Sequence, residues 1–264
     1  MKKIVIIGGG NMGFTYAEGI FNASIGEIEI LEKSENRIKE IKAMNKMAVT
    51  NDYEVLKSAD VIFLAVKPQV APVVFEEIKG LVNNQQLFVS VMAGMKMQSI
   101  QQGLAVDKVI RCMPNLPAAI QLGATTFTCS QGVDHEEKEL ISKILASTGI
   151  AFEVPSEEAI DNTTGISGSG PAYIFYFMNA MEKAGKALGF SPEESKSLVV
   201  QTFKGAVQLY EDNDLDLVEW MNRVASKGGT TRAALDNFDA NNLDKLIQEG
   251  VQACVNRARE LGEN

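Results

Sequence analysis

Ile4-Val5-Ile6-Ile7-Gly8-Gly9-Gly10-Asn11-Met12-Gly13 is the stretch of sequence that decides the fold. Its first four residues form a continuous apolar run, as a buried parallel strand requires. The glycines follow at once with G-x-G-x-x-G spacing, residues 14–21 have a helical pattern, and a second strand is expected over 27–31. Glu32 ends that strand, about twenty residues beyond the glycines, and this order is typical of a dinucleotide site. A glycine-rich turn in an α/β protein that binds no nucleotide is the alternative.

Further cofactor contacts are expected where other predicted strands end, because strand carboxyl ends face the ligand in an open α/β sheet. A helix predicted over 36–47 precedes these strands, which cover residues 61–65, 87–91 and 109–113. The last of them runs into a stiff loop with two prolines. Lys67 is equally compatible with a surface lysine before a helix. The predicted cofactor-binding residues are Gly8, Gly10, Asn11, Met12, Gly13, Glu32, Lys33, Ser34, Ala65, Val66, Lys67, Pro68, Met92, Ala93, Gly94 and Asn115.

The sequence leaves the choice between NADH and NADPH undecided. A carboxylate at Glu32 would accept a hydrogen bond from the ribose 2′-OH of NADH and would repel a 2′-phosphate. Lys33, Ser34 and Arg37 beside it could instead hold that phosphate.

The second half of the chain changes character. Strands over 125–129 and 151–154 and a helix over 136–147 complete the alternating part, and everything beyond Pro155 has helical patterns. A capping box of Ser191 and Glu194 is expected to start one of these helices. The predicted fold is therefore α/β, an N-terminal Rossmann dinucleotide-binding domain over 1–155 followed by an all-α domain over 156–264. Residues 174–178 are apolar on every face, which predicts that this helix is buried between two chains of a homodimer.

Composition excludes several classes of protein. The 264 residues carry a formal charge of -9, which argues against nucleic acid as a partner. The short apolar run near the N-terminus is broken by glycines and suits neither a signal peptide nor a membrane span. The three cysteines lie far apart without metal-ligand spacing, so we expect no metal and a reduced, cytoplasmic location. The single histidine, His135, is expected in a solvated first helical turn.

A second glycine-rich turn, Ser226-Lys227-Gly228-Gly229-Thr230-Thr231, carries the predicted substrate chemistry. One helix is expected to end near Ala225 and another to begin at Thr230 or Thr231. The backbone N–H groups at a helix start lack partners within the helix and favour an anion such as a small carboxylate. A plain joint between two helices with a threonine as N-cap is the alternative.

The segment Gly165-Ile166-Ser167-Gly168-Ser169-Gly170 separates two kinds of dehydrogenase. Its glycines match the interdomain helix of the β-hydroxyacid dehydrogenases, but Ile174 and Met178 stand at the lysine and asparagine positions. Oxidation of an alcohol needs a group that takes the hydroxyl proton, so this activity is disfavoured. A cyclic imine is basic enough to be protonated already, and its reduction needs mainly positioning.

The chain resembles the pyrroline-5-carboxylate reductases over essentially its full length. The resemblance rests on residues 8–13, 65–69, 111–117, 168–173 and 226–231, of which the last set is the most specific. Two residues depart from the family pattern: Lys227 replaces a proline and Leu116 replaces a threonine.

The resemblance implies hydride transfer from NADPH or NADH to the imine carbon of pyrroline-5-carboxylate, which yields L-proline. It assigns Thr231 to the ring nitrogen, with Ser226, Gly228, Gly229 and Thr230 around the carboxylate. It also implies intertwined dimers, in some cases assembled into decamers, with each substrate site near the partner subunit. The alternatives are a related Rossmann imine, deazaflavin or hydroxyacid oxidoreductase, and a nucleotide-sensing scaffold without turnover.

Overall fold

The computed structural model describes residues 1–44 and 46–263. It comprises two compact units, unit 1 with Met1–Pro171 and Ala253–Asn264, and unit 2 with Ala172–Gln252. Asn45, which falls in the helix predicted over 36–47, and Asn264, the last residue of the predicted helical domain, lie outside the described residues.

An eight-stranded sheet, counted over the described residues, forms the centre of unit 1. Its order is β3-β2-β1-β4-β5-β6-β7-β8, and neighbouring strands are parallel except for the antiparallel pair β6–β7. The order reverses between β1 and β4, which is where an open α/β sheet binds ligands. The strands are β1 Lys2–Ile7, β2 Gly26–Leu31, β3 Ala48–Thr50, β4 Val61–Leu64, β5 Leu87–Ser90, β6 Val109–Met113, β7 Gly123–Cys129 and β8 Gly149–Glu153.

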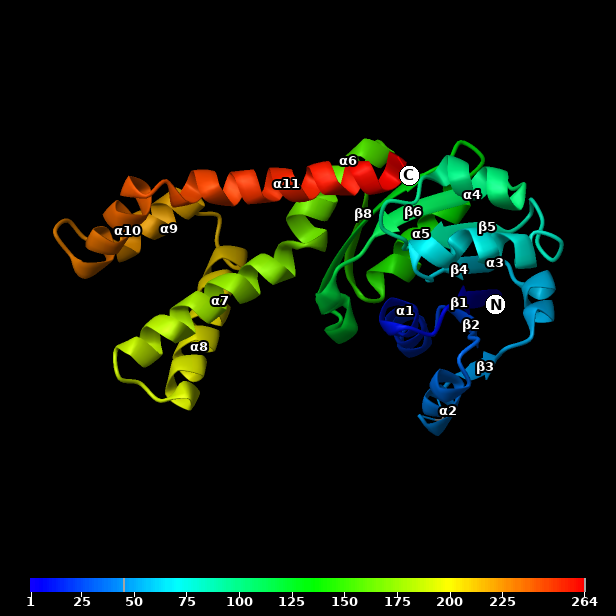
Figure 1. The fold of residues 1–264 in the computed structure, drawn as a ribbon, viewed down its shortest axis with the longest axis horizontal. Helices are drawn as coiled ribbons and strands as arrows, with labels where there is room; N and C mark the ends of the chain where they lie inside the picture. Colours follow the sequence, from blue (N-terminus) through cyan, green and yellow to red (C-terminus); the bar gives the residue numbers. More distant parts are fainter. Residues whose placement is uncertain (45, 264) are drawn as a thin grey trace. The chain divides into compact units, whose positions relative to one another are not determined.

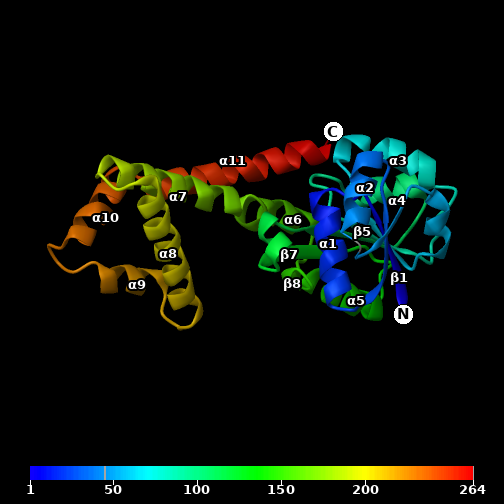
Figure 2. The same cartoon turned by 90° about the horizontal axis from the view of Figure 1, so that it is seen from below.

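Helices cover both faces of the sheet, because the central strands are apolar on both sides. One core joins the sheet to α1 (Asn11–Asn22), α2 (Glu35–Ala43) and α5 (His135–Ala146). The other joins it to η1 (Tyr53–Ser58), α3 (Ala71–Ile78) and α4 (Met97–Leu104). Figures 1 and 2 show α3 and α4 together on one side of the sheet and α1 on the other. This two-layered cover confirms the predicted Rossmann architecture.

The helix predicted over 36–47 is too long at its C-terminal end. α2 ends at Ala43, and the short strand β3 follows at Ala48–Thr50, where it pairs with β2 at the sheet edge. A three-residue edge strand has too little periodicity to be found from sequence. The proline-containing loop after β6 contains a single 3₁₀ turn, η3 (Leu116–Ile120). It has no crossover helix, so β7 returns antiparallel to β6.

The end of unit 1 is joined to the sheet by a buried ion pair. Helix α6 (Glu157–Thr163) packs on β6 and β7 and continues as a π-helix, η4 (Thr164–Gly168). The Arg111 guanidinium on β6, whose side chain is 3% exposed, donates to Asp161 at 2.5 Å and to Glu157 at 3.2 Å. These bonds fix the segment that precedes the helical unit.

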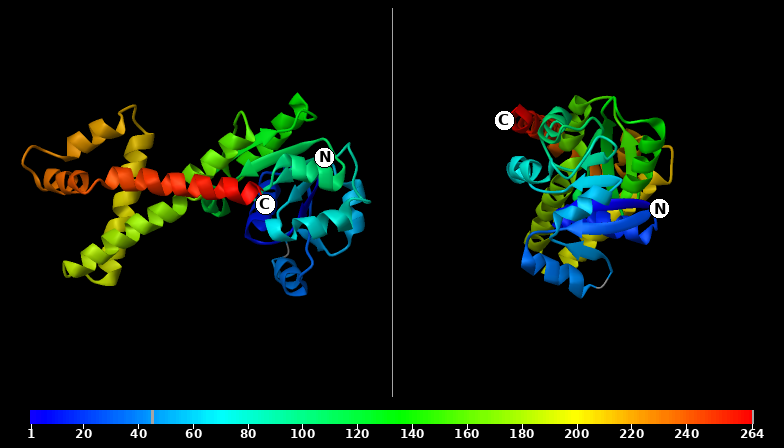
Figure 3. Two further views of the ribbon diagram at one scale, coloured as in Figure 1. Left: turned by 45° about the horizontal axis from the view of Figure 1, so that its top comes forward. Right: turned by 90° about the vertical axis from the view of Figure 1, so that its right-hand side faces the viewer.

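Unit 2 is helical throughout, as predicted. α7 (Gly170–Ala187) and α8 (Pro192–Glu211) diverge from a short connection (Figure 3), and α9 (Leu217–Val224), α10 (Thr230–Ala240) and the first half of α11 (Leu243–Glu263) follow. The predicted capping box of Ser191 and Glu194 starts α8. In the single chain Phe175 and Tyr176 of α7 are 56% and 74% exposed. This helix therefore presents a large apolar surface that the chain itself does not cover.

Candidate active site

The glycine loop after β1 has the shape that a dinucleotide phosphate requires. Gly8 has φ +101°, and a Cβ there would lie 2.7 Å from the Ala65 carbonyl oxygen. A Cβ on Gly13 would lie 2.0 Å from the Gly8 oxygen, so both positions demand glycine. At Gly10 an added Cβ would meet none of the described atoms within 4 Å. The loop is therefore tight where it packs on the protein and free at Gly10.

Helix α1 begins directly at this loop. Gly10 is its N-cap, and among the described residues no side chain caps the helix and none in its first turn is acidic. Its first N–H groups and the positive end of its dipole are thus available to an anion. The predicted residues Asn11 and Met12 lie in this first turn. The loop and the helix start fit the pyrophosphate of a nicotinamide dinucleotide.

Glu32 follows β2 and reaches back to the glycine loop. Its Oε2 accepts from the Gly9 N–H at 2.8 Å and its Oε1 accepts from the Ser34 N–H at 2.8 Å. The carboxylate thus joins two chain segments at the position where a Rossmann fold binds the ribose. The structure places Glu32 where the sequence predicted it.

The neighbouring cations are bonded to carboxylates. Lys33 Nζ lies 2.6 Å from Glu77, which also accepts from the Tyr53 hydroxyl. The bond from Lys33 holds the pKa of Glu77 below its ordinary value, and the bond to Glu77 raises the pKa of Lys33. Arg37 donates to the Gly9 carbonyl oxygen at 2.6 Å and to Glu40 at 2.8 Å. Ser34 caps α2.

The other predicted cofactor residues come from the ends of β4 and β5. Ala65, Val66, Lys67 and Pro68 follow β4, the strand at which the sheet order reverses, and the Lys67 residue is exposed. Met92, Ala93 and Gly94 follow β5, and Met92 is buried. Gly94 has φ +74°, and a Cβ there would lie 3.1 Å from the Cβ of Leu261 on α11. Small residues at 93–94 therefore serve a close contact with the last helix, which sequence reasoning did not foresee.

Asn115 is held by the protein itself. Its Oδ1 accepts from the Ala124 N–H at 2.9 Å, and its Nδ2 donates to the Ser167 carbonyl oxygen in η4 at 3.1 Å. A direct contact between Asn115 and the cofactor stays a prediction. The two bonds position the loop after β6 against β7 and η4. Leu116, which departs from the family pattern, lines a cavity of about 290 Å³ together with Asn11 and Met12.

The second glycine turn lies in unit 2, between α9 and α10. The Gly229 N–H donates to the Ser226 carbonyl oxygen at 3.0 Å, and Gly228 has φ +73°. A Cβ on Gly229 would lie 2.5 Å from the Ser226 Oγ, so a larger residue there would displace the Ser226 hydroxyl. Within the described part of the chain, α10 starts at Thr230 with Gly229 as N-cap and with no side-chain cap.

The N-cap of α10 differs from the one expected for a plain joint between helices, and the role of the turn in substrate binding stays a prediction. A plain helix joint was expected to use a threonine hydroxyl as its cap, and neither Thr230 nor Thr231 fills that position. The first N–H groups of α10 therefore keep their capacity for an anion. Sequence reasoning missed one neighbouring contact: Arg232 Nη2 donates to Asn222 Oδ1 at 3.2 Å and links α10 to α9 beside the turn.

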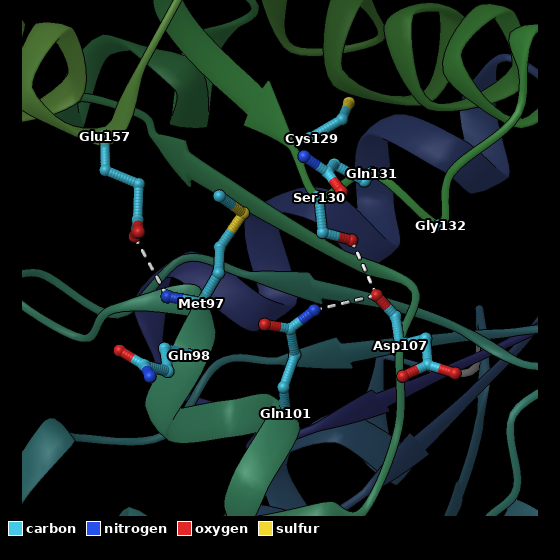
Figure 4. A pocket seen from close by; sticks show the side chains of 9 residues that line it. All are labelled: Met97, Gln98, Gln101, Asp107, Cys129, Ser130, Gln131, Gly132 and Glu157. Atoms are coloured by element: carbon cyan, nitrogen blue, oxygen red, sulfur yellow. Dashed lines mark hydrogen bonds between the residues drawn. The ribbon is translucent and has the colours of Figure 1, made fainter.

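A different cavity, of about 680 Å³, lies in unit 1 beside the start of α4 (Figure 4). Its polar groups bond to one another: Gln101 and Ser130 both donate to the Asp107 carbonyl oxygen, and Glu157 accepts from the Met97 N–H. None of the residues predicted for the active site lines it. It is lined by Met97, Gln98, Gln101, Asp107, Cys129, Ser130, Gln131, Gly132 and Glu157.

His135 begins α5 with its side chain 86% exposed, in agreement with the predicted solvated turn. Over residues 1–44 and 46–263, no helix combines the length and the apolar character that a bilayer crossing needs.

The fold and the glycine loop define the class of protein, a nicotinamide-dinucleotide-dependent oxidoreductase of the Rossmann type. Residues 3–94 match the family model described as NADP oxidoreductase coenzyme F420-dependent. Residues 157–261 match the model for pyrroline-5-carboxylate reductase dimerisation, so the chain carries an oligomerisation domain. Together with an identity of 34% to a pyrroline-5-carboxylate reductase over 99% of this chain, this match shows that the chain belongs to the pyrroline-5-carboxylate reductase family.

Individual relatives cover the whole chain. It is 34% identical over 265 residues to the pyrroline-5-carboxylate reductase of Pseudomonas aeruginosa, covering 99% of this chain and 97% of the relative. The structure of a pyrroline-5-carboxylate reductase from Coxiella burnetii superposes with a TM-score of 0.90 at 33% identity, covering 99% and 98% of the two chains. The Plasmodium falciparum pyrroline carboxylate reductase with NADP bound gives 0.87 at 28% identity, again over 99% and 98%.

Proposed function

We propose that this chain reduces the cyclic imine of pyrroline-5-carboxylate to L-proline, the last step of proline biosynthesis, with NADPH or NADH as reductant. The observation that carries the proposal is the start of α10, a glycine-rich turn without a side-chain cap and with two threonines at its first helical positions. Such a turn offers several N–H groups to one carboxylate. Full-length similarity to reductases of this name supports the same substrate class.

The chain's own residues supply binding and alignment. The N–H groups of Gly228 and Thr230 and the Ser226 hydroxyl are assigned to the substrate carboxylate. Gly229 lines the same turn, and its own N–H donates to the Ser226 carbonyl oxygen. The Thr231 hydroxyl is assigned to the ring nitrogen, where it accepts a hydrogen bond from the protonated imine. Alignment of this kind supplies up to about 7–11 kcal/mol of a rate gain, so neither a histidine nor paired carboxylates are needed.

The residues of the glycine loop, Glu32 and the ends of β4 and β5 are assigned to the dinucleotide. When bound, the reduced nicotinamide supplies a hydride to the imine carbon, so that C=N becomes CH–NH while the dihydropyridine becomes pyridinium. The loop anchors the pyrophosphate on α1, and the strand ends fix the rest of the cofactor.

The proposed reaction is tested by following NADH and NADPH oxidation with pyrroline-5-carboxylate and with a panel of 3-hydroxy and 2-oxo acids. Oxidation is expected with the imine alone, with proline as the product. Turnover of a hydroxy or oxo acid in place of the imine would assign a different reaction, and cofactor binding without any turnover would favour a sensing scaffold.

We further propose a functional boundary at 155/156, a cytoplasmic location and a homodimer that associates further, in the extreme case into a decamer. Phe175 and Tyr176 support the dimer, because an apolar helix of this exposure needs a partner surface.

Replacement of Phe175 by glutamate is expected to dissociate the dimer at micromolar concentration, because burial of an unpaired charge costs on the order of several kcal/mol. Analytical ultracentrifugation measures the change in mass. Val73→Glu on α3, where the parent side chain is similarly exposed at 61%, is the matched control and should sediment as the parent does. A Phe175→Glu protein that keeps the mass of the parent would exclude this helix from the interface.

A further inference from the structure

The side chains around the end of β2 bear on which dinucleotide the chain accepts. This inference rests on the proposed function, because it assumes that the glycine loop holds a nicotinamide dinucleotide. NADPH differs from NADH by a phosphate on the adenosine ribose, the group that a Rossmann fold places beside the residue directly after β2. That residue is Glu32 in this chain.

Glu32 already accepts hydrogen bonds from the backbone N–H groups that a 2′-phosphate at this position would use. Its two carboxylate oxygens each accept a backbone N–H at 2.8 Å, one from Gly9 and one from Ser34. A 2′-phosphate entering there would have to displace the carboxylate from both N–H groups and would meet its negative charge. A ribose hydroxyl, in contrast, can donate to a carboxylate oxygen while both backbone bonds persist, because a carboxylate accepts about four hydrogen bonds.

The cations beside Glu32 are committed to other groups. Lys33 is bonded to both oxygens of Glu77, at 2.7 and 2.6 Å. The Tyr53 hydroxyl donates to the same carboxylate. Arg37 is divided between the Gly9 carbonyl oxygen and Glu40. With Glu32 included, three carboxylates face two cations here. Both positive residues are therefore already paired with carboxylates in the folded chain, and a phosphate would compete with Glu77 and Glu40 for them.

We propose that Glu32 makes this chain bind NADH in preference to NADPH, and that the ion pair between Glu77 and Lys33 supports this preference. Glu32 accepts from the ribose hydroxyl and repels the additional phosphate. Glu77 keeps the nearest ammonium group from compensating for that repulsion. Neither residue takes part in the transfer of hydride, so both are specificity determinants.

The test is a fluorescence titration of NADH and NADPH on the full chain, which reports binding independently of turnover. The parent is expected to bind NADH at least about tenfold more tightly, an effect between those of one like-charge contact in bulk water and one near a protein surface. Glu32→Gln should reduce this ratio about tenfold, with weaker NADH and stronger NADPH binding. Glu77→Gln should strengthen NADPH binding about threefold by releasing Lys33 and leave NADH binding unchanged.

Glu54→Gln is the matched control, because Glu54 is an exposed glutamate paired with Lys57 at 2.7 Å outside this cluster. It should leave the ratio at the parent value. A parent that binds NADPH as tightly as NADH would overturn the proposal, as would Glu32→Gln and Glu77→Gln variants that keep the parent ratio.

Imine-dependent oxidation, measured on the same proteins, separates this inference from the proposed reaction. Reduction of pyrroline-5-carboxylate with NADPH as the favoured cofactor would contradict the proposed NADH selectivity and would still support the proposed reaction. NADH-selective binding without imine turnover would support the selectivity and contradict the proposed reaction.

Discussion

Replacement of Thr231 by alanine is expected to lower kcat/KM for pyrroline-5-carboxylate by one to three orders of magnitude, about 1.4–4 kcal/mol in transition-state stabilisation. Thr231 is the second residue of α10, adjacent to the N–H groups assigned to the carboxylate. Loss of its hydroxyl leaves the protonated ring nitrogen without its proposed acceptor, so the ring loses its alignment. Steady-state kinetics with saturating cofactor measures the change.

The dinucleotide Kd of the Thr231→Ala variant should equal that of the parent, because the residue is not assigned to the cofactor. Thr231→Ser, which restores a hydroxyl, should recover most of the activity. Thr202→Ala is the matched control: the Thr202 hydroxyl on α8 donates to the Leu198 carbonyl oxygen and is exposed. An alanine variant at 231 with the activity of the parent would rule out the assigned role.

Replacement of Arg111 by methionine is expected to lower the free energy of unfolding by about 3–5 kcal/mol, the usual cost of breaking a buried ion pair. The Arg111 side chain is 3% exposed, and its partner Asp161 is 13% exposed. Removal of the guanidinium leaves that carboxylate largely buried without a counter-charge. Denaturant unfolding, followed at one fixed protein concentration because the chain associates, measures the loss.

Arg257→Met provides the comparison for this variant. Arg257 pairs with Glu260 on the surface of α11, with side chains 64% and 59% exposed, and loss of such a pair costs about 1 kcal/mol or less. If Arg111→Met unfolds at the same denaturant concentration as Arg257→Met, the pair on β6 makes no special contribution to stability. Asp161→Asn should show an intermediate loss, because the amide oxygen still accepts one hydrogen bond.

Much of unit 1 could be predicted because its signals are local. The apolar run of β1 and the glycines after it lie within twelve residues of the sequence, and β6 has the predicted bounds Val109–Met113. The helices of unit 2 were found through their 3.6-residue period and their caps, as at Ser191. Each of these patterns is complete within one or two turns or strands of the chain.

The missed features have weaker local signals. β3 is three residues long, and pairing with β2 makes it a strand. The π-helix η4 depends on a bond from the Ser169 N–H to the Thr164 carbonyl oxygen, five residues back, within a segment whose glycines and β-branched residues are poor helix formers. The placement of Gly94 against Leu261 joins residues from opposite ends of the chain.

The sequence by itself determined the Rossmann unit, the helical second half and the glycine turn at 226–231, because strand runs, glycines and helix caps act on neighbouring residues. Only the tertiary structure decided which partners the charged groups choose. Glu32 bonds to Gly9, 23 residues away, Lys33 to Glu77 and Arg111 to Asp161. Such pairs depend on which chain segments the sheet brings together. The residue types along the sequence do not indicate how close two distant segments lie in space.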